Sequence, residues 1–190
     1  MKNAEKLKKA MVPGRVYRRQ DLTGLTSAVD RDLKTLVERG EVSRLAGGLY
    51  CRPKETVFGA APPDDRELVR AFLKTDDFLL TSYDNFNDLG LGLTQLYHTY
   101  IVYNHKRAGD FQLGNKHFKF RLVPAYPKAY TKEYLLVDLL NNLKNLPDDV
   151  SAVRRNLKSH LLEFDRDKMS ECLERYGNSA AKRVFQEAYV

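Results

Sequence analysis

The chain has 190 residues, of which 43% are hydrophobic, and its formal net charge is +7. This length suits one or two domains with a buried core, and without a run of about 20 apolar residues no membrane-spanning helix is predicted. The basic first residues are not followed by an apolar segment, so we expect no secretory signal and a cytoplasmic location. Cys51 and Cys172 are too far apart, and too isolated from histidines, to predict a disulfide framework or a zinc site.

The basic charge is concentrated at the start of the chain. Residues 1–54 hold 13 lysines and arginines against 6 acids, whereas residues 55–190 hold 19 of each. A local cationic excess is typical of a module that faces nucleic acid, although solubility alone would explain the charge equally well.

The element order in this basic part predicts a winged helix-turn-helix. The expected elements are helices at 4–11, 19–22 and from the N-cap Thr26 to Gly40, with strands at 16–17, 42–45 and 49–52. Apolar residues recur at helical spacing from Val29 to Val37. The run Ala46–Gly48 predicts a tight hairpin between the last two strands, because glycine adopts the positive φ that such turns require.

A composition shift follows this module. Pro53, Gly59, Pro62 and Pro63 interrupt regular structure, so we predict a winged helix-turn-helix domain at 1–54, a linker at 55–65 and an α/β domain at 66–190. The expected fold class is therefore α+β, with a small sheet and a helical C-terminal part. In the second domain we expect helices that begin at Asp64 or Asp65, Thr131, Asp148 or Asp149, 166 and 180, and strands at 98–104, 111–113 and 117–123.

One face of the third helix suits the major groove of DNA. At 100° per residue, Ser27, Arg31, Lys34 and Thr35 lie opposite the apolar stripe, where arginine would bond a guanine edge and the others a base or a phosphate. Most charged helix faces are merely solvated, and the adjoining glycine hairpin is what favours DNA here. The predicted DNA-binding residues are Arg18, Arg19, Ser27, Arg31, Lys34, Thr35, Arg44, Arg52 and Lys54.

The stretch "VPGRVYRRQDLTGLTSAVDRDLKTLVERGEVSRLAGGLYCRP" resembles the N-terminal winged-helix region of AbiEi-type antitoxins of bacterial type IV toxin–antitoxin systems. The later segments "DDRELVRAFLKTDDFLLTSYDNFNDLGLGLTQLY" and "EYLLVDLLNNLKNLPDD" are similar to the second domain of that family. The resemblance implies a repressor that binds double-stranded DNA at the operator of its own operon. It also implies that the C-terminal domain counteracts a nucleotidyltransferase-like toxin, by contacting either the toxin or its RNA target.

No catalytic or metal-binding constellation is predicted. The glycines of "GLGLTQL" lack a following G-K-[ST], the four histidines lack partners at ligand spacing, and Asp165 and Asp167 are explained by the start of a helix. We therefore expect a protein that is not an enzyme and needs no cofactor.

The second domain contains a further basic group, and the sequence is also compatible with three other functions. The group consists of Arg155, Lys158, Lys182 and Arg183. It would face the toxin or its RNA target, or it is simply a solvated helix surface. The alternative functions are an ordinary winged-helix regulator with a ligand- or protein-sensing C-terminal domain, a nucleic-acid-processing enzyme, and a protein-interaction adaptor.

Overall fold

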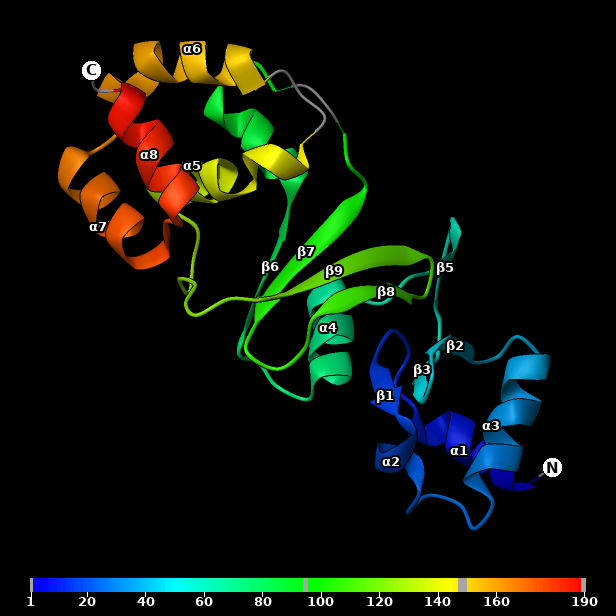
Figure 1. The fold of residues 1–190 in the computed structure, drawn as a ribbon. Helices are drawn as coiled ribbons and strands as arrows, with labels where there is room; N and C mark the ends of the chain where they lie inside the picture. The colour runs from blue at the N-terminus through cyan, green and yellow to red at the C-terminus, as the bar shows by residue number, and fades with distance from the viewer. Residues whose placement is uncertain (1, 94–95, 147–149, 189–190) are drawn as a thin grey trace. The chain divides into compact units, whose positions relative to one another are not determined.

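The computed structural model describes residues 2–93, 96–146 and 150–188. The described chain is α+β, with small sheets and a helical C-terminal part (Figure 1), so the expected fold class is confirmed at this level. No helix in these ranges is long and apolar enough to cross a membrane. The elements are α1 (Lys2–Ala10), β1 (Val16–Arg18), α2 (Arg19–Leu22), α3 (Val29–Glu38), β2 (Ser43–Ala46), β3 (Leu49–Cys51), β4 (Lys54–Thr56), β5 (Gly59–Ala61), α4 (Asp65–Leu73), β6 (Phe78–Ser82), the 3₁₀ helix η1 (Tyr83–Leu89), β7 (Thr99–Asn104), β8 (Gly109–Leu113), β9 (Lys116–Leu122), α5 (Lys132–Asn142), η2 (Leu143–Asn145), α6 (Val150–His160), η3 (Leu161–Glu163), α7 (Arg166–Tyr176) and α8 (Ser179–Ala188).

The chain divides into two compact units. The first consists of residues 1–78 and 106–118, and the second of residues 79–105 and 119–190. The predicted linker lies in the first unit, where β4 and β5 pair as an antiparallel hairpin. The expectation of irregular structure there is wrong, because the prolines fall just outside the two strands and Gly59 adopts a φ of +100°. The division at residues 54 and 66 stays a prediction.

Three helices and a sheet form the start of the first unit. Leu7, Leu22, Leu33 and Leu36 come from α1, α2 and α3 and are buried in one apolar core. The sheet has the strand order β1-β3-β2, and both pairs are antiparallel. The helices and strands predicted for this region are thus present, with ends that differ by a few residues.

The start of α3 differs from the expectation. Thr26 is not its N-cap, because its hydroxyl accepts a hydrogen bond from the backbone N–H of Ala28 (3.2 Å) in the turn before the helix. Ala28 itself stands at the N-cap position and makes no side-chain cap. A threonine satisfies either kind of local N–H, so its presence does not determine the first helical residue.

The predicted glycine hairpin joins β2 to β3. Ala46 pairs with Leu49 across a two-residue turn, and the register shifts between Arg44 and Ala46. Within 46–48 only Gly48 has a positive φ, +74°. A residue with a Cβ would be strained there, which explains one of the two glycines.

Hydrogen bonds connect α4 and the turn between β8 and β9 to this sheet. Asp64 caps α4 by accepting from the N–H of Glu67 (2.9 Å), as predicted. The Glu67 carboxylate in turn accepts from the N–H of Val16 (3.1 Å). In the turn between β8 and β9, Gly114 donates its N–H to the carbonyl of Leu45 (2.7 Å). Residues distant in sequence therefore support the basic segment.

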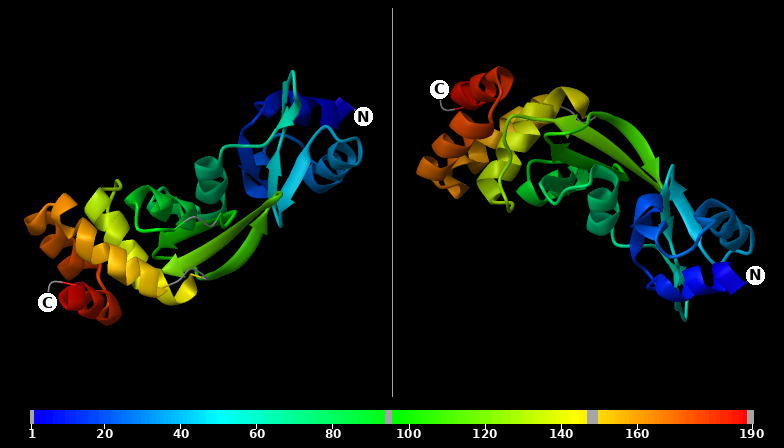
Figure 2. Two further views of the ribbon diagram at one scale, coloured as in Figure 1. Left: turned by 90° about the horizontal axis from the view of Figure 1, so that it is seen from above. Right: turned by 90° about the horizontal axis from the view of Figure 1, so that it is seen from below.

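The largest sheet has the strand order β6-β7-β9-β8. Its strands β7, β8 and β9 match the predicted ranges, whereas β6 was not expected from the sequence. In the second unit, α5 packs against α7 and α8 (Figures 1 and 2). Thr131 and Asp165 cap α5 and α7 as predicted. Asp148 and Asp149 lie outside the described residues.

Candidate nucleic-acid interface

The face of α3 that was predicted to meet DNA is directed outward. Val29, Leu33 and Leu36 are buried against α1 and α2. Ser27, which precedes the helix, and Arg31 on the helix are exposed. Further along the same side of the helix, Lys34 is exposed and Thr35 is half-buried. Glu38, one turn beyond them, is exposed.

Arg31 is an exposed cation of this face. In the described part of the chain no ion pair or hydrogen bond occupies its guanidinium. Lys34 lies 3.8 Å from Glu38, and both side chains are largely exposed, so solvent screens that pair strongly. Thr35 donates its hydroxyl to the carbonyl of Arg31 (2.9 Å) and keeps lone pairs free for a further donor.

Arg18 and Arg19 have partners within the protein. Arg19 makes a two-pronged contact with Asp30, with Nε–Oδ1 and Nη2–Oδ2 distances of 2.6 Å. This contact raises the pKa of Arg19 and lowers the pKa of Asp30. Arg18 bonds Asp21 in the same way at 3.1–3.3 Å. A phosphate would have to compete with these carboxylates.

The backbone of Arg19 also links the helices to the hairpin. Its N–H donates to the carbonyl of Gly48 at 2.8 Å. The Arg19–Asp30 pair connects the start of α2 to the start of α3. Arg19 therefore positions both the glycine turn and the first turn of α3, which carries Arg31.

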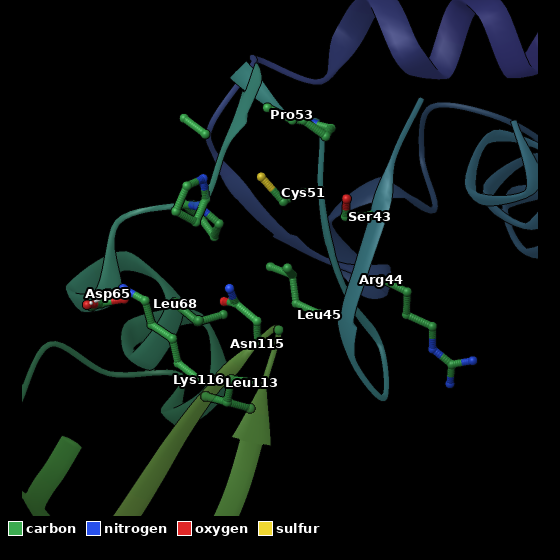
Figure 3. A pocket seen from close by; sticks show the side chains of 15 residues that line it. Ser43, Arg44, Leu45, Cys51, Pro53, Asp65, Leu68, Leu113, Asn115 and Lys116 are labelled. Atoms are coloured by element: carbon green, nitrogen blue, oxygen red, sulfur yellow. Dashed lines mark hydrogen bonds and ion pairs between the residues drawn. The ribbon is translucent and has the colours of Figure 1, made fainter. Parts of the chain in front are cut away.

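The remaining predicted cations occupy different environments. Arg44 on β2 is exposed, and in Figure 3 its side chain points away from the neighbouring cavity. Lys54 on β4 is also exposed. Arg52 instead donates to the carbonyls of Lys8 and Met11, at 3.2 Å each, and so satisfies the end of α1. This structural role was not predicted, and a DNA contact of Arg52 stays a prediction.

The cavity of Figure 3 has a volume of about 310 Å³. Its walls come from β2, β3, residues 60–63, α4 and the turn between β8 and β9. Cys51 lines it, and burial raises the pKa of this thiol to about 11. The thiol therefore stays protonated near neutral pH and is a poor nucleophile. Among the described residues no cluster of acids, histidines and cysteines fits a metal ion.

The second basic group projects from two neighbouring helices. Arg155 and Lys158 are exposed on α6, and Lys182 and Arg183 are exposed on α8. These helices pack together, and Arg154 forms an ion pair with Glu187 across them at 3.0 Å.

Two buried acids were missed by the sequence analysis. Asp32 on α3 is 5% exposed, and Asp138 on α5 is 2% exposed. The signal for Asp138 was present in the sequence, because it interrupts the apolar run Leu135–Leu140. An ionisable residue that is buried away from an ion-pair partner is a candidate functional residue.

Comparison with known proteins gives the fold only. No protein-family model and no curated protein matches the chain. A solved structure, the Rv2827c protein from Mycobacterium tuberculosis, is similar with a TM-score of 0.61 and 17% sequence identity. The match covers 97% of this chain and 75% of that chain. At this identity the likeness supports a shared architecture and carries no function.

Proposed function

We propose that the start of the chain is a winged helix-turn-helix that binds duplex DNA, and that the protein represses its own operon as an antitoxin of a type IV toxin–antitoxin system. The observation that carries the DNA-binding part is the outward face of α3. Arg31 is exposed on the side opposite the helix's buried residues, and within the described residues its side chain has no ion-pair or hydrogen-bond partner. The antitoxin part is supported by the resemblance of the sequence to AbiEi-type antitoxins.

The contacts around α3 favour this proposal over a solvated surface. Arg19 joins α2, α3 and the glycine turn through its side chain and its backbone. The groove-facing helix and the wing would thus be held in a fixed geometry before DNA arrives. Such preorganisation reduces the entropy lost on binding.

The proposed mechanism is occlusion of a promoter. Arg31 would read a base edge, while Lys34, Arg44 and Lys54 would neutralise phosphates. Each phosphate contact releases counterions, so the logarithm of the affinity should fall by about 0.9 per contact for each unit of log salt concentration.

Binding to operator and random duplexes, measured by fluorescence anisotropy, tests the DNA-binding proposal. Arg31→Ala should cost about 1–3 kcal/mol on the operator and much less on random DNA. Lys54→Ala should weaken both duplexes equally and reduce the salt slope by about 0.9. Arg39→Ala is the matched control, because Arg39 follows the same helix but pairs with Glu5 at 3.3 Å.

Two outcomes would contradict this assignment. Equal losses on both duplexes for Arg31→Ala would remove its base-reading role. Absence of duplex binding by the unmodified protein at low salt would favour an interaction adaptor instead.

The antitoxin proposal needs a separate test. The proposal requires a neighbouring gene for a nucleotidyltransferase-like toxin, and this chain should restore growth of cells that express that toxin. Charge reversal at Arg155 and Lys158 should abolish the rescue if the second basic group acts, whereas charge reversal at Lys128, elsewhere in the second unit, should not. Full rescue by both variants would exclude that surface, and failure of the unmodified chain to rescue would exclude the antitoxin role.

A further inference from the structure

The second unit contains a cavity with a volume of about 510 Å³. Its lining comes from the segment 121–125 at the end of β9, from α5, and from the junction between α7 and α8. Sites for small molecules usually have volumes of about 300–1,000 Å³. The cavity therefore has room for a ligand of ordinary metabolite size.

Asp138 contributes a buried acceptor to this lining. Its Oδ1 accepts from the hydroxyl of Tyr103 (2.6 Å) and from the side-chain amide of Asn142 (3.0 Å). Its Oδ2 is buried and has no hydrogen-bond partner among the described residues. Because an unsatisfied buried oxygen is costly, native structures usually pair such an atom with water or a ligand.

The neighbours of Asp138 hold its carboxyl group in one orientation. Asn142 also donates to the backbone carbonyl of Asp138 (2.8 Å) and accepts from the hydroxyl of Tyr83 (3.0 Å). The oxygen without a partner therefore belongs to a fixed network. Because Asp138 lines the cavity, we assign its unpartnered oxygen as the acceptor for an N–H donor of the ligand.

Aromatic rings and arginines complete the lining. Tyr134 and Tyr176 meet edge to face, with ring centroids 5.1 Å apart. Arg121 is exposed and has no ion pair in the described chain. Arg175 contacts Glu171 at 3.1 Å, but its side chain remains 60% exposed. The two guanidinium groups favour an anion, and they oppose a polyamine.

We propose that this cavity binds a nucleoside monophosphate whose base carries an amino group. The base would pack against the tyrosines and donate to Asp138, and the phosphate would contact Arg121. The amino group of the base matches the acceptor, the ring of the base matches the tyrosines, and the phosphate matches Arg121. This cavity belongs to the second unit, and the inference does not depend on the function proposed for α3.

Isothermal titration calorimetry on the full chain at pH 8, where Asp138 is ionised and can accept, tests the proposal with AMP and CMP as probes. Adenosine and ribose 5-phosphate serve as fragments that lack the phosphate or the base. AMP should bind at least about tenfold more tightly than either fragment. Binding of ribose 5-phosphate as tight as that of AMP, or binding of spermidine in place of nucleotides, would overturn the proposal.

Two variants separate the contributions. Asp138→Asn replaces an acceptor by a donor of the same shape, so AMP should bind about tenfold more weakly. Arg121→Ala should reduce AMP affinity to that of adenosine and leave adenosine unchanged. Because Arg121 is exposed, this variant tests the site even if Asp138→Asn alters the fold.

The control is Lys119→Ala, on the same strand as Arg121 but outside the cavity lining. It should leave AMP binding unchanged. Equal losses of AMP affinity for Lys119→Ala and Arg121→Ala would mean that any nearby positive charge has the same effect, and would overturn the phosphate contact of Arg121. AMP affinity unchanged in both the Asp138 and the Arg121 variants would overturn the site.

Discussion

Replacement of Asp138 by asparagine should remove a pH dependence from the stability of the second unit. Burial raises the pKa of Asp138 from its ordinary 3.8 to about 7, although hydrogen bonds from Tyr103 and Asn142 favour the charged form. Between these two pH values the folded protein keeps a proton that the unfolded chain has released. The contribution to stability is therefore complete below about pH 4 and is lost as the pH rises through about 7.

The size of the effect follows from this difference in pKa. About 3 pKa units, at about 1.4 kcal/mol each, give a total of about 4 kcal/mol, of which about 2–3 kcal/mol falls between pH 5 and 8. The hydroxyls of Tyr103, Tyr130 and Tyr134 interact with Asp138, and burial raises their pKa values above the ordinary one. These tyrosines stay neutral in that range, so the change belongs to Asp138.

Urea unfolding followed by circular dichroism at pH 5 and pH 8 measures this difference. The free energy of unfolding of Asp138→Asn, relative to the unmodified protein, should rise by about 2–3 kcal/mol from pH 5 to pH 8. Asp165→Asn is the control, because the pKa of this exposed N-cap is lowered and not raised. A relative stability of Asp138→Asn that is constant within about 0.5 kcal/mol would refute the reasoning.

Three further predictions follow from single contacts. Arg52→Ala should lower the free energy of unfolding by about 1–2 kcal/mol, because the carbonyl of Met11 loses its donor and that of Lys8 keeps only the N–H of Met11. Arg44→Ala, at an exposed site, should change this free energy by less than about 0.5 kcal/mol. Equal losses for the two variants in urea unfolding would contradict the role assigned to Arg52. Asp64→Ala should cost about 1 kcal/mol through loss of the bond to the N–H of Glu67, and an unchanged melting temperature would exclude this cap. The thiol of Cys51 should react with Ellman's reagent at pH 8 only after the protein unfolds, because the residue is 1% exposed and its pKa is raised to about 11. Rapid labelling of Cys51 in the folded protein, with the labelled cysteine identified by mass spectrometry, would disprove its burial.

Local interactions explain the features that were predictable from sequence. The caps at Asp64, Thr131 and Asp165 are confirmed because each side chain bonds a backbone N–H two or three residues ahead. The hairpin at Gly47 and Gly48 was equally predictable from the sequence, because its turn depends on the φ that a residue type permits. The misplaced N-cap at Thr26 shows the limit of such rules, because a threonine hydroxyl can cap either a turn or a helix.

Contacts between distant residues decided what the sequence left open. Periodicity predicted that Arg31 faces outward, but the partners of Arg52 lie more than 40 positions away and follow no spacing rule. Asp138 was visible as an acid within an apolar run, yet only the folded chain brings Tyr103, 35 positions earlier, to its Oδ1. The sequence by itself determined local conformation and the location of charge, because these depend on neighbours along the chain. Tertiary structure decided which charges are engaged and which polar atoms are buried, because burial depends on what packs from elsewhere.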